Sequence, residues 1–415
     1  MGANASTTEV SRGTVRLGLR ALLLQLGASC AAAAEPSDSA DPPGAWTFSA
    51  VYTADLLRNA HGGLDVGNAY LDNLDVSLEV DGDLAFGVPG LQLFAYGLYN
   101  NAARFSERLS GDAMTASNID APRAIRLYEA WADWTFDASA SMRFGLYDLN
   151  SEFDTTEARS LFHNSTFGVG HELGQTGRNG PSIFPSTSLA LRMAFKPAAD
   201  WTLLVAAFDG VPNDPEHPSR TRIHVGGDDG ALLITELQRS GPRLTKLAAG
   251  AWHYTEPFER IDDALLGSPS PRKDSSSGAY ALADLTVWQD SLDSDRRVEA
   301  FARIGFASDT VNEYDSSAQV GIILRQPFTR RTQESLGFAV AAARTGDPYR
   351  RAQRALGSPI EAAEAVLEIT YRYALTPWLT VQPDVQYILN PGADRSLRDA
   401  LVLGLRIELA AEKSW

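Results

Sequence analysis

Cysteine is almost missing from this sequence, and its scarcity removes several kinds of chemistry. The one cysteine, Cys30, lies in an alanine-rich segment near the N-terminus. If that segment is removed on export, disulfides, cysteine-based metal sites and a cysteine nucleophile are all excluded. A lipid anchor on Cys30 is disfavoured, because Gly27 stands where such a site needs a bulky aliphatic residue.

Long apolar runs are also missing. After residue 35 no stretch approaches the roughly 18 to 20 apolar residues that a membrane-spanning helix needs. Apolar residues nevertheless make up 44% of the chain. A protein of this composition that crosses a membrane must therefore use a closed β-barrel, in which apolar residues alternate with polar ones.

Positive charge is in short supply. Lys and Arg number 36 against 52 Asp and Glu, so the net charge is −16. This balance argues against a nucleic-acid partner, because phosphates require a basic face. It fits acidic external loops, but acidic soluble proteins are common and the charge decides nothing further.

The first 34 residues have the three parts of an export signal. An apolar run at 17–27 is followed by small residues up to position 34, and basic residues precede and flank the run: Arg12, Arg16 and Arg20. This order is typical of a signal peptide, and A-x-A cleavage sites lie before Glu35. A retained N-terminal extension is the alternative.

Period-two alternation is the strongest pattern in the chain. Between 74 and 81, apolar residues occupy the even positions, and the odd positions hold Asp75, Ser77, Glu79 and Asp81. We expect about sixteen antiparallel strands, the even number that a barrel with both ends in the periplasm requires. They fall near 46–53, 74–81, 91–100, 125–136, 141–148, 187–195, 201–208, 230–237, 244–254, 278–288, 297–306, 318–325, 334–343, 364–373, 379–388 and 400–409.

The connections between these strands alternate in length. Short ones carry turn residues, as at 137–140, 196–200, 238–243 and 374–378. Long ones are expected at 56–73, 101–123, 149–186, 209–229, 255–277 and 344–362. Short periplasmic turns and long external loops are what an outer-membrane barrel shows, whereas a propeller or soluble sandwich would not sort its connections in this way.

Aromatic residues near strand ends predict interfacial girdles. They are Trp46, Tyr52, Trp134, Phe136, Phe195, Trp201, Trp252, Tyr254, Tyr371, Tyr373 and Tyr387. The alternative is the core of a β-sandwich, but acids and arginines fill the opposite face of these segments, which favours the barrel.

The chain therefore divides into three expected segments: a signal peptide at 1–34, a flexible leader at 35–45 and one outer-membrane β-barrel domain at 46–415. No Gly/Ser linker and no fixed repeat interrupts the last segment. Its longest connection, 149–186, is rich in aromatics, glycine and proline and is expected to be ordered. In a barrel too wide to be filled by its own side chains, we expect this loop to fold into the lumen and narrow it.

Several strings resemble the carbohydrate-selective porins of the OprB family. They include YTADLLRN at 52–59, YLDNLD at 70–75, RLYEAW at 126–131, GLYDLNSEFD at 145–154 and GRNGPSIF at 177–184. The resemblance covers nearly the whole mature chain and is densest from 52 to 235. It implies a sixteen-stranded outer-membrane barrel for diffusion of sugars, with a loop-narrowed constriction that carries arginine.

The C-terminus departs from the usual pattern of such barrels. They usually stop at an aromatic residue that closes the last strand, whereas here residues 410–414 follow Leu409 before Trp415. Either the last strand is extended or the assembly signal is atypical.

Candidate pore-lining residues follow from alternation and from the family strings. Arginine and carboxylate side chains can bond sugar hydroxyls, and aromatic rings can pack on sugar C–H faces. Each candidate has an alternative role in an ion pair that stiffens the barrel without touching solute. The candidates are Glu129, Asp133, Arg143, Asp148, Asn150, Glu152, Arg178, Asn179 and Arg192, with Arg126, whose position in the alternation matches the apolar face.

Two weaker signals point to other chemistry. Oxygen-bearing side chains stand at every second position from Asp148 to Asp154, but the glycine and distal glutamate of a calcium loop are missing. His163, Ser165 and His171 share one connection, but no nucleophile elbow or placed acid supports a serine hydrolase.

The preferred hypothesis is a passive porin for small carbohydrates, surrounded by outer-membrane lipid, with no cofactor, no metal, no catalysis and no nucleic-acid partner. A homotrimer is what porins of this size usually form, and the sequence leaves the oligomeric state open. Two alternatives stay open: a non-transport outer-membrane barrel, such as a hydrolase or a surface carbohydrate-binding protein, and a secreted β-sandwich.

Overall fold

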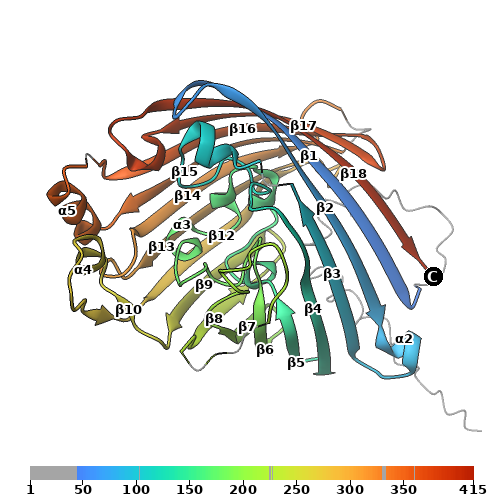
Figure 1. Ribbon diagram of the computed structural model, residues 1–415. Coiled ribbons are helices and arrows are strands. Elements are labelled where there is room, and N and C mark those ends of the chain that lie inside the picture. The colour runs from blue at the N-terminus through green and yellow to red at the C-terminus, as the bar shows by residue number, and fades with distance from the viewer. Residues whose placement is uncertain (1–43, 102, 224–225, 227, 330–332, 359) are drawn as a thin grey trace, which may run out of the picture.

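The computed structural model describes residues 44–101, 103–223, 226, 228–329, 333–358 and 360–415. The expected signal peptide, and the expected leader up to residue 43, lie outside the described residues. In the described part of the chain, sixteen strands form one closed barrel (Figure 1). The helices there are all too short or too polar to cross a membrane.

Strands adjacent in the sequence pair antiparallel around the barrel, and β1 pairs with β18 to close it. Two further short strands, β10 and β11, form a hairpin outside the barrel sheet. The strand bounds are β1 Trp46–Gly63, β2 Gly67–Asp81, β3 Leu91–Asn100, β4 Ala124–Asp137, β5 Ala140–Tyr147, β6 Ser188–Ala198, β7 Trp201–Asp209, β8 Ala231–Arg239, β9 Leu244–Tyr254, β10 Phe258–Glu259, β11 Lys273–Asp274, β12 Ser277–Gln289, β13 Arg297–Ala307, β14 Tyr314–Arg325, β15 Glu334–Thr345, β16 Ala363–Thr376, β17 Leu379–Leu389 and β18 Arg398–Ser414.

Short helical segments lie in the connections. Two α-helices, α4 and α5, belong to long loops on the same side of the barrel and pack against each other. The helical segments are α2 Gly82–Phe86, η2 Ser106–Ser110, η3 Leu149–Ser151, η4 Arg159–Leu161, η5 Ser165–Phe167, α3 His171–Gly174, α4 Ile261–Leu265, α5 Asp347–Ala355 and η6 Pro391–Ala393.

Side-chain exposure shows that the polarity of the molecule is inverted relative to a soluble protein. On β18, Leu405 is 37% exposed, whereas the next residue, Arg406, is 6% exposed. On β13, Ile304 is 47% exposed and the adjacent Arg303 is 3% exposed. Apolar side chains thus form the outer face and charged side chains the inner one, an arrangement that suits a barrel surrounded by lipid. The predicted fold class is confirmed.

One predicted loop, 56–73, is wrong. Strand β1 runs on to Gly63 and β2 begins at Gly67, so only residues 64–66 connect them. The polar residues that suggested a loop belong to the ladder or close the turn. Asn59, which is fully buried, donates hydrogen bonds to the carbonyl oxygens of Gly62 (2.8 Å) and Asp65 (2.9 Å). The other long connections lie where alternation predicts them.

The last strand is extended, which resolves the question that the C-terminus raised. Ser414 pairs with Thr47 at the end of the β1–β18 ladder. The backbones of Trp46 and Trp415 then exchange hydrogen bonds of 3.1 and 3.0 Å. Residues after Leu409 therefore complete the seam that closes the barrel.

The predicted aromatic girdle is partly wrong. Trp134 and Phe136 are 48% and 52% exposed on the outer face, as a girdle requires. Trp252 and Tyr254, however, are 3% and 1% exposed, because the even positions of β9 face inward. These two rings pack in the interior of the barrel instead.

Candidate functional site inside the barrel

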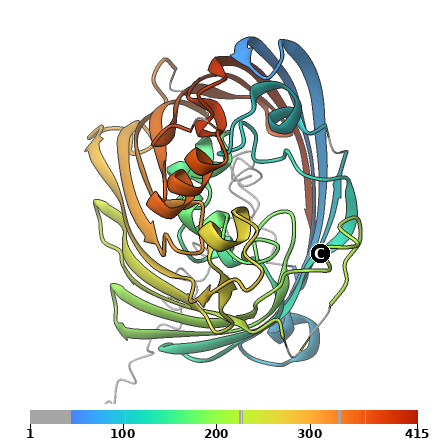
Figure 2. The same cartoon turned by 60° about the vertical axis from the view of Figure 1, so that its left-hand side comes forward.

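Two connections fold into the barrel. We call residues 101 and 103–123, between β3 and β4, the short inner loop, and residues 148–187, between β5 and β6, the long inner loop. Figure 2 looks partly into the mouth that carries α4 and α5, and coils of the inner loops are visible behind them within the ring of strands. Each loop forms hydrogen bonds with strands that lie far around the barrel from the two strands that the loop connects.

A first anchor holds the start of the long inner loop to the strands beside it. The Glu152 carboxylate accepts hydrogen bonds of 2.8 Å from Nε and Nη2 of Arg192, on β6. Arg192 Nη2 also lies 2.6 Å from Asp133 Oδ2, and Arg143 Nε lies 3.0 Å from the same oxygen. The Arg143 guanidinium stacks over the Trp131 ring, 3.7 Å from its centroid. Glu152, Asp133, Arg143 and Arg192 thus form one buried ion-pair cluster.

The Glu152 carboxylate of this anchor stays charged over a wide pH range. Burial alone would raise the pKa of Glu152, but the positive charges of Arg143 and Arg192 outweigh it and lower the pKa to about 2. A depressed carboxylate pKa contributes stability above the unfolded-state value of about 4.3. That contribution is lost only as pH falls through the folded-state value, so the anchor is expected to persist at pH 4.

A second anchor joins the middle of the long inner loop to the far wall. Arg303, on β13, has a fully buried side chain and lies 2.7 Å from Asp154 and 2.6 Å from Glu172. Glu236, on β8, accepts a hydrogen bond of 2.8 Å from the backbone N–H of Asp154. Arg159 in turn donates to Gln319, on β14, at 3.0 Å. The loop therefore crosses the interior of the barrel.

A third anchor holds the loop to β16 and β17. The Glu368 carboxylate accepts hydrogen bonds from the backbone N–H groups of His163 (2.6 Å) and Asn164 (3.0 Å). The Asn164 amide donates to Gln386, on β17, at 3.2 Å. The His163 carbonyl oxygen accepts from the backbone of Asn118 at 2.7 Å, so the two inner loops touch each other.

The short inner loop forms hydrogen bonds with carboxylates of the wall. Asp55, on β1, lies 2.7 Å from Arg406, on β18, and accepts a hydrogen bond of 2.7 Å from Ser117 Oγ. Glu364, on β16, accepts from the backbone N–H groups of Ala113 and Met114 at 2.8 and 2.9 Å. Carboxylates of the wall thus satisfy loop backbone that no strand pairs.

The predicted pore-lining residues lie in different parts of the structure. Asp133, Arg143, Glu152 and Arg192 come together in the first anchor, and each is at most 7% exposed. Their contact with solute stays a prediction, since in this arrangement their charges face one another.

The remaining candidates lie apart from this cluster and act mainly on loop backbone. Glu129 accepts from the backbone of Asp148 (2.9 Å), and the Asn150 amide donates to carbonyl oxygens of the long inner loop itself. Asn179 donates to the carbonyl oxygen of Pro212 (2.7 Å). Arg178 is 45% exposed and lies 3.7 Å from Asp229. These contacts give the candidates a positioning role, and solute contact stays a prediction for them too.

Arg126 faces inward although simple alternation places it on the apolar face. The pairing of β3 with β4 shifts by one residue next to Tyr128. The consecutive residues Tyr128 and Glu129 are therefore both buried, and the inward-facing positions of β4 change from even to odd numbers at this point. This β-bulge is what sequence parity missed. The Arg126 guanidinium donates to the carbonyl oxygens of Pro185 (2.5 Å) and Pro218, and so joins two external loop ends.

We expect Arg126→Ala to loosen both loop ends, because the two carbonyl oxygens lose a charged donor. The cost is about 1 to 3 kcal/mol of stability. Hydrogen–deuterium exchange should become faster in residues 183–188 and 216–221. Arg123→Ala, an exposed residue directly before β4, is the matched control. Unchanged exchange in the Arg126 variant would contradict the assigned role.

Sequence reasoning missed a set of arginines on the inner face. Arg297 and Arg325 both bond Glu299, at 2.6 and 2.8 Å, and Arg372 lies 2.8 Å from Glu408. The three arginine side chains retain 16% to 27% exposure, so solvent reaches them. All five residues alternate with apolar residues in the sequence, so the period-two pattern alone would have predicted that they face the interior.

The two weaker signals do not assemble into sites. Glu152 and Asp154 bond different arginines, in the first and second anchors, so the oxygens expected for calcium do not converge. Ser165 Oγ donates to the carbonyl oxygen of Ser117 (3.3 Å). Among the described residues, no hydrogen bond joins Ser165 to His163 or His171.

A closed sixteen-stranded barrel with an apolar outer face, a charged inner face and inward-folded loops defines an outer-membrane porin. A family model described as carbohydrate-selective porin, OprB family, matches residues 66–410, and the chain belongs to this family.

The chain is also similar to individual porins. Porin B of Pseudomonas aeruginosa is 23% identical over 398 residues, which cover 88% of this chain and 87% of the relative. A protein named putative porin QuiX, from Acinetobacter baylyi, is 23% identical over 86% of this chain and 88% of its own length. These relatives are porins, which are channels and not enzymes.

Solved structures support the fold. The high-pH structure of OprB from Pseudomonas putida superposes with a TM-score of 0.80 at 21% identity, covering 88% of this chain and 94% of that chain. The outer-membrane channel DcaP of Acinetobacter baumannii has a TM-score of 0.54 at 12% identity, covering 88% and 97%. Membership of the porin family places the protein in the bacterial outer membrane.

Proposed function

We propose that this porin conducts small carbohydrates by passive diffusion through the space that the two inner loops leave beside the barrel wall. The family to which the chain belongs supports the solute class. The observation that carries the proposal is the inward row of partly exposed arginines on β13, β14 and β16, which pair with buried glutamates on β13 and β18. No covalent step and no cofactor enter the proposal.

The chemistry of this row suits neutral polyols. A guanidinium presents parallel N–H donors that can bond two adjacent hydroxyl groups, and a carboxylate accepts from sugar O–H groups. Because Arg297 and Arg325 share the Glu299 carboxylate and Arg372 pairs with Glu408, three arginines face two glutamates and the row keeps one net positive charge. A passing sugar can exchange hydrogen bonds with the row and with water, so that binding stays weak enough for release.

The loops set the width of the passage. The long inner loop is bonded to β4–β6 at one end and to β13, β16 and β17 further along, which holds it across the lumen. Its fixed position supports a constant constriction over one that opens and closes.

Reconstitution into planar bilayers tests the proposal. We expect discrete conductance steps, reduced in a concentration-dependent way by monosaccharides, and liposome swelling that falls as the sugars become larger. Absence of discrete conductance, or conductance that no sugar reduces, would oppose the proposal. Hydrolysis of a lipid by the wild type but not by Ser165→Ala would favour the alternative of a barrel enzyme.

Within this proposal, Arg325→Gln is expected to weaken the sugar block by about tenfold, which corresponds to about 1.4 kcal/mol for a lost charged hydrogen bond. The measurement is the sugar concentration that halves single-channel conductance. Arg239→Gln, half-exposed in an ion pair with Asp200, is the control and should match the wild type. Equal values for the two variants would remove Arg325 from the solute path.

Two further expectations belong to the same proposal. Association into a trimer is proposed because porins of this size usually form one, and chemical cross-linking in detergent tests it. Removal of residues 1–34 on export is proposed from their composition, and N-terminal sequencing of the protein isolated from outer membranes tests it.

A further inference from the structure

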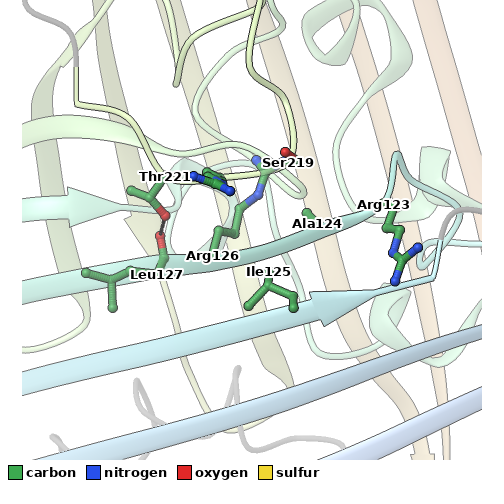
Figure 3. Close-up of a pocket in the computed structure, with 8 residues that line it drawn as sticks. Arg123, Ala124, Ile125, Arg126, Leu127, Ser219 and Thr221 are labelled. Carbon is green, nitrogen blue, oxygen red and sulfur yellow. Dashed lines mark hydrogen bonds between the residues drawn. The ribbon is translucent and has the colours of Figure 1, made fainter.

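A groove of about 620 Å³ lies at the loop-bearing end of β4, on the outer side of the wall. It is formed by one segment of β4 and one segment of the loop that follows β7. Figure 3 shows the two segments side by side, with Ser219 and Thr221 next to the strand. The residues that line it are Arg123, Ala124, Ile125, Arg126, Leu127, Ser219, Arg220 and Thr221.

The groove is built from backbone bonds. The hydrogen-bond ladder between β4 and β5 begins at Ala130 of β4. Residues 124–129 of β4 therefore have one edge that β5 does not pair with. The loop segment takes that edge: Ile125 N–H donates to Ser219 O (3.2 Å), and Thr221 Oγ donates to Leu127 O (2.7 Å). The Arg126 side chain fastens the inner side through Pro218.

The groove lies at the outer membrane boundary. Trp134 and Phe136 mark the opposite boundary on the same strand, where aromatic girdles lie. About nine residues separate Trp134 from Ile125, which at about 3.4 Å per residue and a tilt of about 40° corresponds to roughly 23 Å of height. An outer-membrane barrel has an apolar band about 25 Å tall, so Ile125 lies where lipid headgroups begin.

The groove combines an apolar floor with positive charge. Ile125 is 71% exposed and Leu127 is 44% exposed on the outward face. Arg123 and Arg220 are exposed beside them, and neither forms an ion pair with another described residue. Of the acids that precede Arg220 in the same loop, Asp214 is paired with Arg222 and His217, and the exposed Glu216 lies beside that group. In a chain of net charge −16, this is a local site for an anion.

We propose that this groove binds a phosphorylated lipid of the outer leaflet. Arg123 and Arg220 take the headgroup phosphate, and the first segment of an acyl chain lies against Ile125 and Leu127. Guanidinium groups are suited to phosphate oxygens, since they donate two parallel hydrogen bonds. The site is separate from the lumen, so it does not depend on the proposed transport of sugars.

Native mass spectrometry of the full porin, released from detergent with diphosphoryl lipid A, tests this site. We expect a lipid-bound peak that is about tenfold weaker in the double variant Arg123→Glu with Arg220→Glu. The control carries the same charge change at Arg351→Glu with Arg354→Glu, exposed on α5, and should retain the wild-type amount. Arg123→Gln with Arg220→Gln serves if charge reversal impairs assembly.

Three outcomes would overturn the proposal. They are equal retention by the groove and control variants, equal retention of lipid A from which both phosphates have been removed, and displacement of the lipid by millimolar inorganic phosphate. The last result would identify a site for the free anion. Ile125→Ser separates the two halves of the ligand, because it is expected to weaken lipid retention while leaving the arginines in place.

Discussion

Replacing Arg303 by alanine is expected to detach the long inner loop and to lower the free energy of unfolding by about 3 to 5 kcal/mol. The Arg303 side chain is fully buried between Asp154 and Glu172, at 2.7 and 2.6 Å. Its removal leaves two carboxylates buried without their main positive partner, and such a loss costs more than the pair itself contributes. By leaving the wall, the loop returns the Asp154 and Glu172 carboxylates to water.

Two measurements check this expectation. Single-channel conductance should rise because the passage widens, and the urea midpoint of unfolding in micelles should fall. Arg239→Ala breaks a half-exposed ion pair and should change stability by about 1 kcal/mol or less. Arg303→Met combined with Glu172→Gln removes one charge of each sign, leaves Asp154 paired with Arg159, and should restore most of the lost stability. Wild-type conductance and stability in Arg303→Ala would refute the anchor.

The strands could be predicted from the sequence because their environment repeats every two residues. Consecutive residues of a strand face lipid and the interior in turn. The adjacent residues Arg303 and Ile304 therefore differ in polarity, since Arg303 faces the interior and Ile304 faces lipid. All sixteen predicted segments correspond to barrel strands in the described part of the chain. Their ends were less accurate at 56–73, where β1 and β2 continue past the apolar stretches that identified them.

The anchors could not be predicted in the same way, because they join residues far apart in the sequence. Nothing local links Asp154 to Arg303 or His163 to Glu368, although each pair is in contact. Local parity also failed at Arg126, where one bulge reverses the faces of β4. Periodicity therefore identifies which side chains enter the lumen, whereas loop folding decides which of them remain open to solute.

The family strings contain residues that hold the long inner loop in place, and contact of these residues with solute stays a prediction. Motif residues such as Glu152 and Asp154 lie at the start of the long inner loop, and the structure uses both to hold it. Arg325 and Arg372 lie outside those strings and remain partly exposed in the interior. Residues that position a loop and residues that meet a solute have the same composition, so only geometry distinguishes them.

A charge introduced on the lipid-facing side of the barrel should destabilise the fold by a different mechanism from the loss of Arg303. Leu405→Arg is expected to destabilise the barrel by roughly 2 to 4 kcal/mol, because a guanidinium at the bilayer midplane loses its water. Leu405 is 37% exposed near the middle of β18, paired with Leu56 on β1 and Pro383 on β17. The neighbouring Arg406 is tolerated only because it faces inward and bonds Asp55.

Reversible folding into lipid vesicles, followed by tryptophan fluorescence in urea, measures the cost. Leu266→Arg is the matched control, since Leu266 is 53% exposed but follows α4 in an external loop. That variant should fold with nearly wild-type stability. Equal stabilities of the two variants would mean that Leu405 does not meet lipid, and the outer face of β18 would then have to be reassigned. A loss confined to Leu405→Arg fits only a wall whose apolar side is solvated by acyl chains.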